Sequence, residues 1–462
     1  MPSNGPVDIR LDSWKEIANY LKRDVRTVRR WESENGLPVH RIPGAQKVFA
    51  YASELDTWLD GDSRRVPLDT EVRSGGAAWR KPRAWGALMA AALLLTLAGS
   101  WILSQHSRPL AAPPRFSFTR TDYPSPGAAW VVSADFNGAG HSDLLVANGH
   151  ADTISVMLNQ GDGKFGERLD IVVGREPEVL ALGDFNNDGR LDVAVSRFAP
   201  SDTGIVVLLG DGAGDFRQAS SFAIPNHTKG VAVGDFNRDG YLDLAVGMRD
   251  RVAIFLGKGD GTFRKGAEIP RPLSASDIHA GDLNHDGILD LVWANFGAGS
   301  GHNLSVAMGN GDGTFKPPVD YPADQAPVGI CIADLNHDGV PDIVSANFVG
   351  SVTVLLGRGD GTFGPERTYP TAESNGTVAV ADMDGDGNPD LIVLNLHAGA
   401  VLLLPGKGDG TFGAPAEFRV GLYPTAVAIA DLNGDGKLDL AVSAAMGDSV
   451  SVLENASRRP GR

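Results

Sequence analysis

Residues 381–390, "ADMDGDGNPD", place four carboxylates within nine positions, at Asp382, Asp384, Asp386 and Asp390. Carboxylates this close repel one another, so the run folds tightly only if something neutralises them. The same pattern, Asp-x-Asn/Asp-x-x-Gly-x-x-Asp, recurs along the chain at intervals of 47 to 52 residues. Its copies begin at Asp135, Asp184, Asp235, Asp282, Asp334, Asp382 and Asp431. A period of this length predicts a fold built from one repeated supersecondary unit.

Each copy of the repeat contains four short segments of strand character. An apolar stretch such as "GVAVGDF" leads into the acidic run, and a second such as "LDLAVG" follows it. A third, such as "VTVLLG", ends in a glycine-rich turn of the type "GDGTF", and a fourth segment such as "GPERTYP" completes the unit. Four short strands separated by turn residues are typical of a propeller blade. One blade cannot cover its own apolar faces, so seven copies predict seven blades around an axis.

The two ends of the repeat region predict how the ring closes. The last copy stops after its third strand, "SVSVLEN" (449–455), without a glycine-rich turn or a fourth strand. The region begins at "RFSFTRTDYPSP" (115–126), which resembles the segments that follow the turn in other copies. We therefore expect the first strand to complete the last blade, which removes an open sheet edge. The predicted fold of residues 116–455 is an all-β seven-bladed propeller.

The repeat resembles the FG-GAP (VCBS-type) repeats of integrin alpha-chain propellers and their bacterial relatives. Residues 411–415, "TFGAP", carry the sequence for which that family is named. The resemblance covers about residues 116–455 and implies that the acidic loops bind Ca²⁺.

The residue types in the loop independently favour Ca²⁺. This ion takes six to eight oxygen ligands, and the side chains at positions 1, 3, 5 and 9 with the carbonyl of position 7 can surround one ion. The glycine at position 6 permits the sharp reversal of the chain. No His or Cys stands at a ligand position, which disfavours zinc, and Mg²⁺ demands a stricter octahedral geometry. A loop closed by side-chain-to-backbone turns without metal is the alternative.

The sequence ranks the seven loops by their carboxylates. The loop at Asp382 has Asp at all four side-chain positions and is predicted to bind most tightly, while the loop at Asp135 has Ala139 at position 5 and is predicted to be weak or empty. Six loops therefore make up the predicted Ca²⁺ sites. Their residues at positions 1, 3, 5, 7 and 9 are Asp184, Asn186, Asp188, Arg190, Asp192; Asp235, Asn237, Asp239, Tyr241, Asp243; Asp282, Asn284, Asp286, Ile288, Asp290; Asp334, Asn336, Asp338, Val340, Asp342; Asp382, Asp384, Asp386, Asn388, Asp390; and Asp431, Asn433, Asp435, Lys437, Asp439.

The ions are expected to be structural, and no enzyme activity is expected. Metal-assisted catalysis needs an open coordination position with a base beside it. His285 and His337 occupy position 4, between ligands, and are expected to face solvent. Outside the loops, no nucleophile with a partner base and no phosphate-binding loop stands out in the sequence. The single cysteine, Cys331, excludes an intramolecular disulfide and is interpreted as a core residue.

Residues 85–103, "WGALMAAALLLTLAGSWIL", form an uncharged run of membrane length. Trp85 and Trp101 stand near its ends, as interfacial aromatic residues do, and "WRKPR" (79–83) precedes it. The sequence predicts a single-pass anchor with the N-terminus in the cytoplasm and the C-terminal propeller outside it, in the periplasm or at the cell surface. A buried core helix is the alternative. Residues 61–84 and 104–115 are interpreted as linkers, and 456–462 as a tail.

The segment before the anchor is mildly basic, in contrast to the rest of the chain. Residues 1–84 hold 15 Lys and Arg against 12 Asp and Glu, a net charge of +3, whereas the remainder holds 26 against 45, a net of −19. Residues 11–32 carry two helical patterns, and 39–51 are expected to form a hairpin. About residues 11–59 resemble the winged helix-turn-helix of MerR-like and excisionase-like DNA-binding domains. The residues expected to contact DNA are Arg26, Thr27, Arg29, Arg30, Arg41 and Lys47.

Together these features predict a membrane-tethered regulator with three parts. A winged helix-turn-helix head in residues 1–60 would bind DNA, with dimers on paired half-sites. The propeller would sense or bind an external protein or glycan, for which the long connections at 197–204 and 295–304 are candidate contacts. The alternative is an adhesion or protein-interaction propeller whose head is not a regulator.

Overall fold

The structure is a computed structural model that divides into two compact units, Met1–Arg108 and Pro109–Arg462. It describes residues 115–199, 203–224, 227–270, 274–296, 303–372 and 374–457 of the second unit. In the first unit it describes residues 10–11, 17, 39–41 and 48–51. The predicted anchor (85–103) and both linkers except Arg115 lie outside the described residues, as does most of the predicted helix-turn-helix. Within the described residues, no helix is long and apolar enough to cross a membrane.

In the first unit, a small antiparallel sheet has the order β1-β3-β2. Its strands are β1 (Arg10–Leu11), β2 (His40–Arg41) and β3 (Val48–Tyr51). Strand β2 pairs with β3 through His40 opposite Phe49 and Arg41 opposite Val48, so the hairpin expected over 39–51 is confirmed. Ile17, from the first predicted helical pattern, is fully buried.

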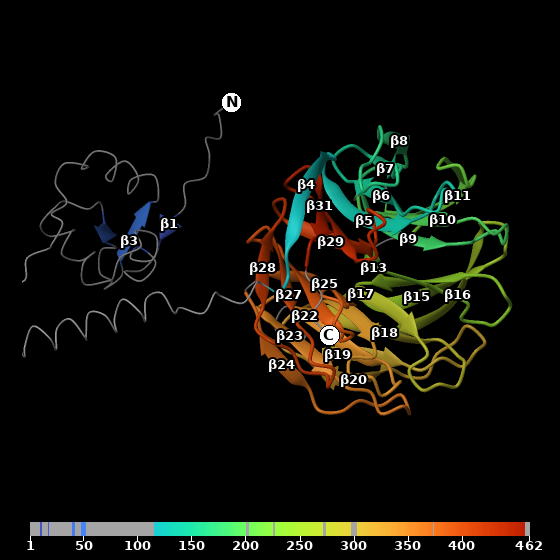
Figure 1. The fold of residues 1–462 in the computed structure, drawn as a ribbon. Helices are drawn as coiled ribbons and strands as arrows, with labels where there is room; N and C mark the ends of the chain where they lie inside the picture. The colour runs from blue at the N-terminus through green and yellow to red at the C-terminus, as the bar shows by residue number, and fades with distance from the viewer. Residues whose placement is uncertain are drawn as a thin grey trace, which may run out of the picture. The chain divides into compact units, whose positions relative to one another are not determined.

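The second unit is a ring of four-stranded antiparallel sheets, and each sheet is one blade (Figure 1). The first four blades follow chain order. Their strands are β5 (Ala128–Ala134), β6 (Asp143–Asn148), β7 (Thr153–Met157) and β8 (Leu169–Val172) in blade 1; β9 (Pro177–Gly183), β10 (Asp192–Arg197), β11 (Gly204–Gly210) and β12 (Phe216–Ala223) in blade 2; β13 (His227–Gly234), β14 (Asp243–Met248), β15 (Arg251–Gly257) and β16 (Phe263–Pro270) in blade 3; and β17 (Ser274–Gly281), β18 (Asp290–Phe296), β19 (Asn303–Ala307) and β20 (Val319–Pro322) in blade 4.

The last three blades have the same order, and the seventh includes a strand from the start of the propeller. Their strands are β21 (Pro327–Ala333), β22 (Asp342–Asn347), β23 (Ser351–Leu355) and β24 (Arg367–Pro370) in blade 5; β25 (Asn375–Ala381), β26 (Asp390–Asn395), β27 (Ala400–Leu404) and β28 (Ala416–Arg419) in blade 6; and β29 (Pro424–Ala430), β30 (Asp439–Ala444), β31 (Ser449–Asn455) and β4 (Phe118–Pro124) in blade 7. The predicted seven-bladed all-β propeller is confirmed.

The ring closes at blade 7, where β4 pairs with β31 from Ser449 opposite Pro124 to Asn455 opposite Phe118. Figure 1 shows β4 beside β31, although more than 300 residues separate them. The prediction that the first strand completes the last blade is therefore confirmed. We call the region where residues 115–118 meet residues 455–457 the seam.

The core lies between the blades. Strands such as β6 and β26 are buried along their whole length because both of their faces meet a neighbouring blade. Each pair of adjacent blades shares one cluster of Val, Leu, Ile, Ala and Phe side chains, including blades 1 and 7. Burial of each large apolar side chain contributes roughly 1.5–3 kcal/mol, so the stacked blades stabilise one another. The acidic loops join the first strand of each blade to the second and therefore lie at one face of the ring.

Candidate functional site

The backbone of the acidic loop folds around the Asp at position 1. In blade 2, Asp184 Oδ1 accepts a hydrogen bond from the amide of Asp188 (3.1 Å), and Oδ2 accepts one from Gly189 (2.8 Å). The same Oδ2 contact with the position-6 glycine occurs in all seven loops. The position-1 carboxylate is therefore the centre of a tight turn, held by backbone amides of its own loop.

Position 4 of every loop has a left-handed backbone conformation. Asn187, Arg238, His285 and His337 have φ values of 58°, 59°, 59° and 60°, and the other three loops have glycine there. Both histidines are exposed, as expected from the sequence. A non-glycine residue pays a steric cost in this conformation, so the turn is imposed by the rest of the loop.

The Asp at position 9 is buried in every blade and holds two strands together. In blade 2, Asp192 Oδ2 accepts from the Phe185 amide (2.8 Å) and Oδ1 accepts from the Gly210 amide at the end of β11 (2.9 Å). Asp143, Asp243, Asp290, Asp342, Asp390 and Asp439 make the equivalent pair of bonds, and all seven side chains are fully buried. Burial raises their pKa, to about 6 for Asp243, Asp342 and Asp390. Position 9 is interpreted from the sequence as a metal ligand, and the structure adds a second role, which is to hold the loop and the end of the third strand together.

Positions 3 and 5 carry the side chains that distinguish one loop from another. In the loops of blades 2 to 5, the Asn at position 3 donates from Nδ2 to the position-5 carboxylate, as Asn186 does to Asp188 (3.0 Å). The position-5 Asp also accepts the amide of position 7, which in blade 2 belongs to Arg190 (2.9 Å). This hydrogen bond comes from the backbone of position 7, so it does not depend on the side chain at that position. The donor set is carboxylate and amide oxygen throughout, which fits Ca²⁺.

The loop of blade 1 keeps this backbone without the fifth-position carboxylate. Asp135 accepts from the amides of Ala139 (3.1 Å) and Gly140 (2.8 Å), and Asp143 accepts from Phe136 (3.0 Å) and Asn159 (2.7 Å). Burial acts to raise the pKa of Asp135, but the surrounding backbone N–H groups outweigh it and lower that pKa. The frame of the loop therefore does not depend on the carboxylate that Ala139 replaces.

The loop of blade 6 brings its carboxylates closest together. Asp382, Asp384 and Asp390 have ligand oxygens within 4.8 Å of one another, and this is the one such group of acidic, His or Cys side chains among the described residues. Asp384 is 2% exposed and Asp390 is fully buried. Burial raises the pKa of Asp384, although a cation beside it opposes the rise. These residues fit a divalent cation.

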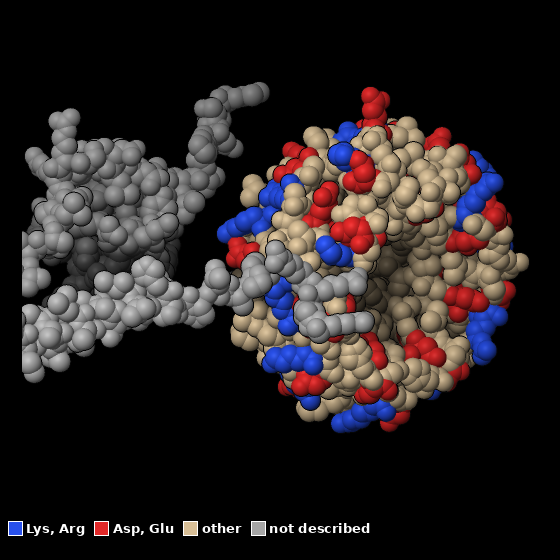
Figure 2. Space-filling model, viewed as in Figure 1, with Lys and Arg blue, Asp and Glu red and all other residues tan. Residues whose placement is uncertain are grey.

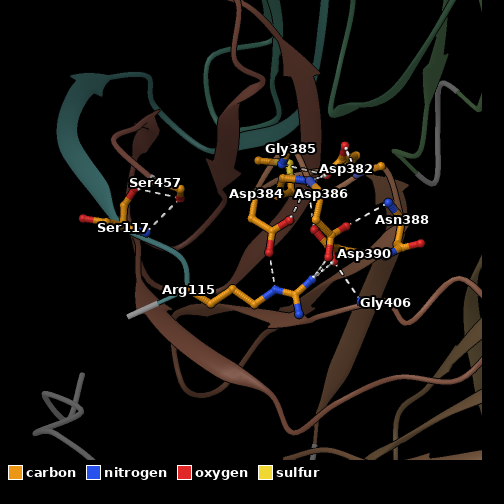
Figure 3. A network of polar contacts seen from close by, with 12 residues as sticks. Arg115, Ser117, Asp382, Asp384, Gly385, Asp386, Asn388, Asp390, Gly406 and Ser457 are labelled. Atoms are coloured by element: carbon orange, nitrogen blue, oxygen red, sulfur yellow. Dashed lines mark hydrogen bonds and ion pairs between the residues drawn. The ribbon is translucent and has the colours of Figure 1, made fainter. Parts of the chain in front are cut away.

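That neighbouring cation is the guanidinium of Arg115 (Figure 3). Arg115 Nε donates to Asp384 Oδ2 and Nη2 donates to Asp386 Oδ2, while Nη2 lies 4.0 Å from Asp390 Oδ1. From the sequence, Arg115 is placed in the linker of residues 104–115, and its contact with this loop is not predicted. The available signal was the missing glycine-rich turn of blade 7, combined with the extra Asp at position 3 of blade 6.

The seam explains why Arg115 reaches this loop. Elsewhere, the glycine-rich turn of one blade covers the acidic loop of the preceding blade, as when Gly313 donates to the Phe236 carbonyl (2.9 Å). Blade 7 has no such turn, and the chain ends occupy its place. Asn455 Nδ2 donates to the Met383 carbonyl (2.7 Å), and Ser117 N donates to Ser457 Oγ (3.0 Å). Arg115 therefore enters the loop from the side that a turn covers in the other blades.

At the opposite ends of the same strands, residues from all seven blades line a cavity of about 470 Å³, which we call the funnel. Its walls are Ala129, Trp130, Phe198, Arg249, Ser276, Asp277, Phe296, Val328, Gly329, Phe348, Asn375, Gly376, Thr377, Leu396, Tyr423 and Thr425. Phe198 and Phe296, each at the start of a connection that the sequence proposed as a ligand contact, are 41% and 44% exposed. On the face of the ring that Figure 2 shows, acidic and basic side chains lie around a central hollow.

Asp277 is the one acidic residue that lines the funnel among the described residues. It accepts from the amides of Ile278 (3.0 Å) and Ile330 (2.9 Å), which fixes its orientation. His279 Nε2 lies 3.6 Å from Asp277 Oδ2, and the His279 side chain is 41% exposed. Burial opposes the charge on His279, but Asp277 outweighs it and raises the pKa of His279. The funnel thus combines aromatic surface with one oriented carboxylate, Asp277, and one arginine, Arg249.

Of the residues expected to contact DNA, the structure describes Arg41, which lies in β2. Arg26, Thr27, Arg29, Arg30 and Lys47 lie outside the described residues. The DNA-contact prediction therefore stays a prediction.

The fold and the loops define a seven-bladed propeller with a repeated acidic turn. The FG-GAP-like repeat family matches the chain over residues 135–195, 184–246, 235–293, 294–345, 334–393 and 382–442. These segments span more than half of the chain, and the protein belongs to this family. The resemblance inferred for the propeller from its sequence is confirmed.

Solved structures share the fold at low sequence identity. The crystal structure of BBS1N in complex with ARL6DN, soaked with lead, has a TM-score of 0.53 and 14% identity over 75% of this chain and 99% of that chain. The same complex soaked with mercury has a TM-score of 0.52 and 13% identity over 74% and 97%. These likenesses show the fold alone. No curated protein matches the chain.

Proposed function

We propose that the propeller is a protein-binding module that takes a basic, apolar segment of a partner into the funnel. The observation that carries the proposal is the wall itself, which joins Trp130, Phe296 and Tyr423 to the oriented carboxylate of Asp277. Aromatic faces and a carboxylate together suit a Lys or Arg side chain flanked by apolar residues. The strongly acidic charge of the region after the anchor favours a basic partner. BBS1N, which shares the fold, forms a complex with a protein.

The test is a selection of random peptides on the purified full-length protein, followed by binding measurements on Asp277→Asn. We expect the selected peptides to contain Lys or Arg next to apolar residues. Asp277→Asn should weaken their binding about tenfold, since a hydrogen bond to a charged group contributes roughly 1.5–3 kcal/mol. Asp122→Asn, on the outer strand β4, is the matched control and should bind normally. Selection of peptides that lack Lys and Arg, or equal binding by Asp277→Asn, would contradict the proposal.

The finer proposal places this propeller in a membrane-tethered transcriptional regulator. Residues 11–59 would bind DNA through Arg26, Thr27, Arg29, Arg30, Arg41 and Lys47, and residues 85–103 would anchor the chain with its N-terminus in the cytoplasm and its propeller outside. The paired strands β2 and β3 support it, because a hairpin is part of the winged motif. Footprinting of genomic DNA with the full chain tests it, with Arg29→Ala/Arg30→Ala as the control variant. Absence of specific protection would leave the alternative of an adhesion propeller.

The acidic loops are proposed to hold structural Ca²⁺ in blades 2 to 5 and 7. Side chains at positions 1, 3, 5 and 9 and the position-7 carbonyl would surround the ion, which would add positive charge between carboxylates. The oxygen-only donor set supports this assignment. Isothermal titration of the full chain with Ca²⁺ tests it, and the lack of any saturable binding would reject it.

A further inference from the structure

The fully acidic loop of blade 6 is also the loop at the seam. In the mixed loops position 3 is Asn, and next to it lies the glycine-rich turn of the following blade. A Cβ built on Gly163 would lie 3.1 Å from the Cβ of Asn433, and one on Gly313 would lie 3.5 Å from that of Asn237. In blade 6 position 3 is Asp384, and the group next to it is the Arg115 guanidinium. Blade 6 therefore has a carboxylate at position 3, and a guanidinium of the same chain is paired with it.

With Arg115 in place, the charge of this loop equals that of the blade-5 loop. Its four Asp side chains and one guanidinium give a net of −3, the same as the three Asp side chains of blade 5, whereas in blade 7 Lys437 lies 3.4 Å from Asp435 and leaves a net of −2. The Arg115 side chain is 40% exposed, whereas the Asp384 side chain is fully buried. Arg115 therefore reaches from solvent into the loop and supplies the charge that neutralises the buried carboxylate.

Arg115 and a Ca²⁺ ion cannot occupy the loop together. Its Nη2 donates to Asp386 and lies 4.0 Å from Asp390, so the guanidinium occupies the space between carboxylates that an ion would need. Ca²⁺ binds oxygen ligands at roughly 2.3–2.6 Å, closer than a guanidinium between them allows. Two cations that share one set of oxygens must compete.

We propose that Arg115 is the resident cation of the blade-6 loop, and that Ca²⁺ binds there only by displacing it. Ca²⁺ then releases the chain that enters the propeller at residue 115, so this loop is a Ca²⁺-sensitive latch. The proposal rests on the proposed Ca²⁺ chemistry of the loops. It changes the expected order of affinities, because the most acidic loop is no longer the tightest.

The release does not extend beyond Arg115 into the propeller. Phe116 is 3% exposed and packs in the cluster between blades 6 and 7. The Ser117 carbonyl accepts from the Ala456 amide (2.8 Å), and β4 stays paired with β31. Closure of the ring therefore survives when the latch opens.

Titration of the full-length protein with Ca²⁺ tests the competition. If the latch is closed in about nine molecules of ten, removing it raises the apparent affinity of this one site about tenfold. We expect Arg115→Gln to gain that affinity at one site and to leave the other sites unchanged. Arg120→Gln, which removes a pair with Asp122 on the outer strand, should match the wild type. Asp384→Asn added to Arg115→Gln should abolish the gain.

An unchanged or weakened site in Arg115→Gln would overturn the latch, whether or not the other loops bind. Ca²⁺ binding at the other loops is read from the same titration, so failure of the general Ca²⁺ proposal is distinguished from failure of the latch. The other loops binding normally while Arg115→Gln gains nothing would reject the latch alone.

Discussion

The acidic loops of blades 1 and 6 have the same backbone but differ in the number of their carboxylates, two in blade 1 and four in blade 6. In both, the position-1 Asp accepts the amide of the position-6 glycine, and the position-9 Asp joins the loop to the end of the third strand. Blade 1 has Ala139 where blade 6 has Asp386, and Asn137 where blade 6 has Asp384. Positions 1, 6 and 9 therefore determine the fold of the loop, and positions 3 and 5 determine which cation it attracts.

The largest expected effect comes from removing the position-9 brace in the loop that lacks a full ligand set. Asp143→Ala leaves the buried amides of Phe136 and Asn159 without acceptors. We expect a loss of about 3 kcal/mol of unfolding free energy, because each unsatisfied buried group costs roughly 1–3 kcal/mol. Urea unfolding measures it, and the loss should be the same in Ca²⁺ and in EGTA. Asp162→Ala, at an exposed turn, is the control and should change stability little. If Asp143→Ala loses stability only in Ca²⁺, position 9 acts mainly as a metal ligand and not as a brace.

A single substitution should give blade 1 the property that it lacks. Ala139→Asp restores the fifth-position carboxylate on an unchanged backbone. We expect a Ca²⁺-dependent gain of roughly 1–2 kcal/mol at several-fold saturation, measured as the difference between melts with Ca²⁺ and with EGTA. Ala139→Ser, which adds a polar group without charge, is the control. If Ala139→Asp responds to Ca²⁺ no more than the wild type does, positions 3 and 5 do not decide binding.

The buried position-9 carboxylates predict a pH dependence that Ca²⁺ should change. Burial raises the pKa of Asp243, Asp342 and Asp390 to about 6, which is above the pKa of an Asp side chain in the unfolded chain. Protonation therefore favours the folded state, and this contribution is lost as the pH rises through about 6. In EGTA, the melting temperature should increase by a few degrees from about pH 7.5 to about pH 5.5. Saturating Ca²⁺ should remove or reverse the trend, and an identical trend in both conditions would contradict it.

The smallest expected effect concerns position 4, where blades 1 and 6 both have glycine. His285 has a φ of 59°, so His285→Gly should stabilise the loop by about 0.5 kcal/mol, after the entropic cost of glycine offsets part of the steric relief. Gly385→Ala, in blade 6, should lose about 1 kcal/mol for the same reason. Thermal melts of both variants and of the wild type measure these two changes in stability. Because the His285 side chain is exposed, Ca²⁺ affinity should not change in His285→Gly.

The number of blades and the closing strand could be predicted because each depends on a pattern within a short stretch of sequence. The repeated acidic run marks the end of a first strand, and the missing turn after residue 455 marks the place for β4. The double role of position 9 could not be predicted, since a carboxylate at that position suits a ligand and a brace equally well. Only the structure shows that both Asp192 oxygens accept backbone amides from different strands.

Two other features depend on contacts between residues far apart in the chain. Arg115 meets Asp384 because the seam leaves that loop without a covering turn, which requires the closed ring. The funnel draws residues from all seven blades, so the long connections pointed to Phe198 and Phe296 but not to Asp277 or Tyr423. For the part of the chain before residue 109, the membrane anchor and the DNA-binding head stay predictions from the sequence.

The most direct test of the difference between blades 1 and 6 is a crystal structure of residues 109–462 with Ca²⁺, with the ions located by anomalous scattering. We predict ions in the loops of blades 2 to 5 and 7 and none in blade 1. In blade 6 we predict either an ion or the Arg115 guanidinium on Asp384, and never both in one molecule. An ion in blade 1, or an ion in blade 6 with Arg115 still paired to Asp384, would contradict the account.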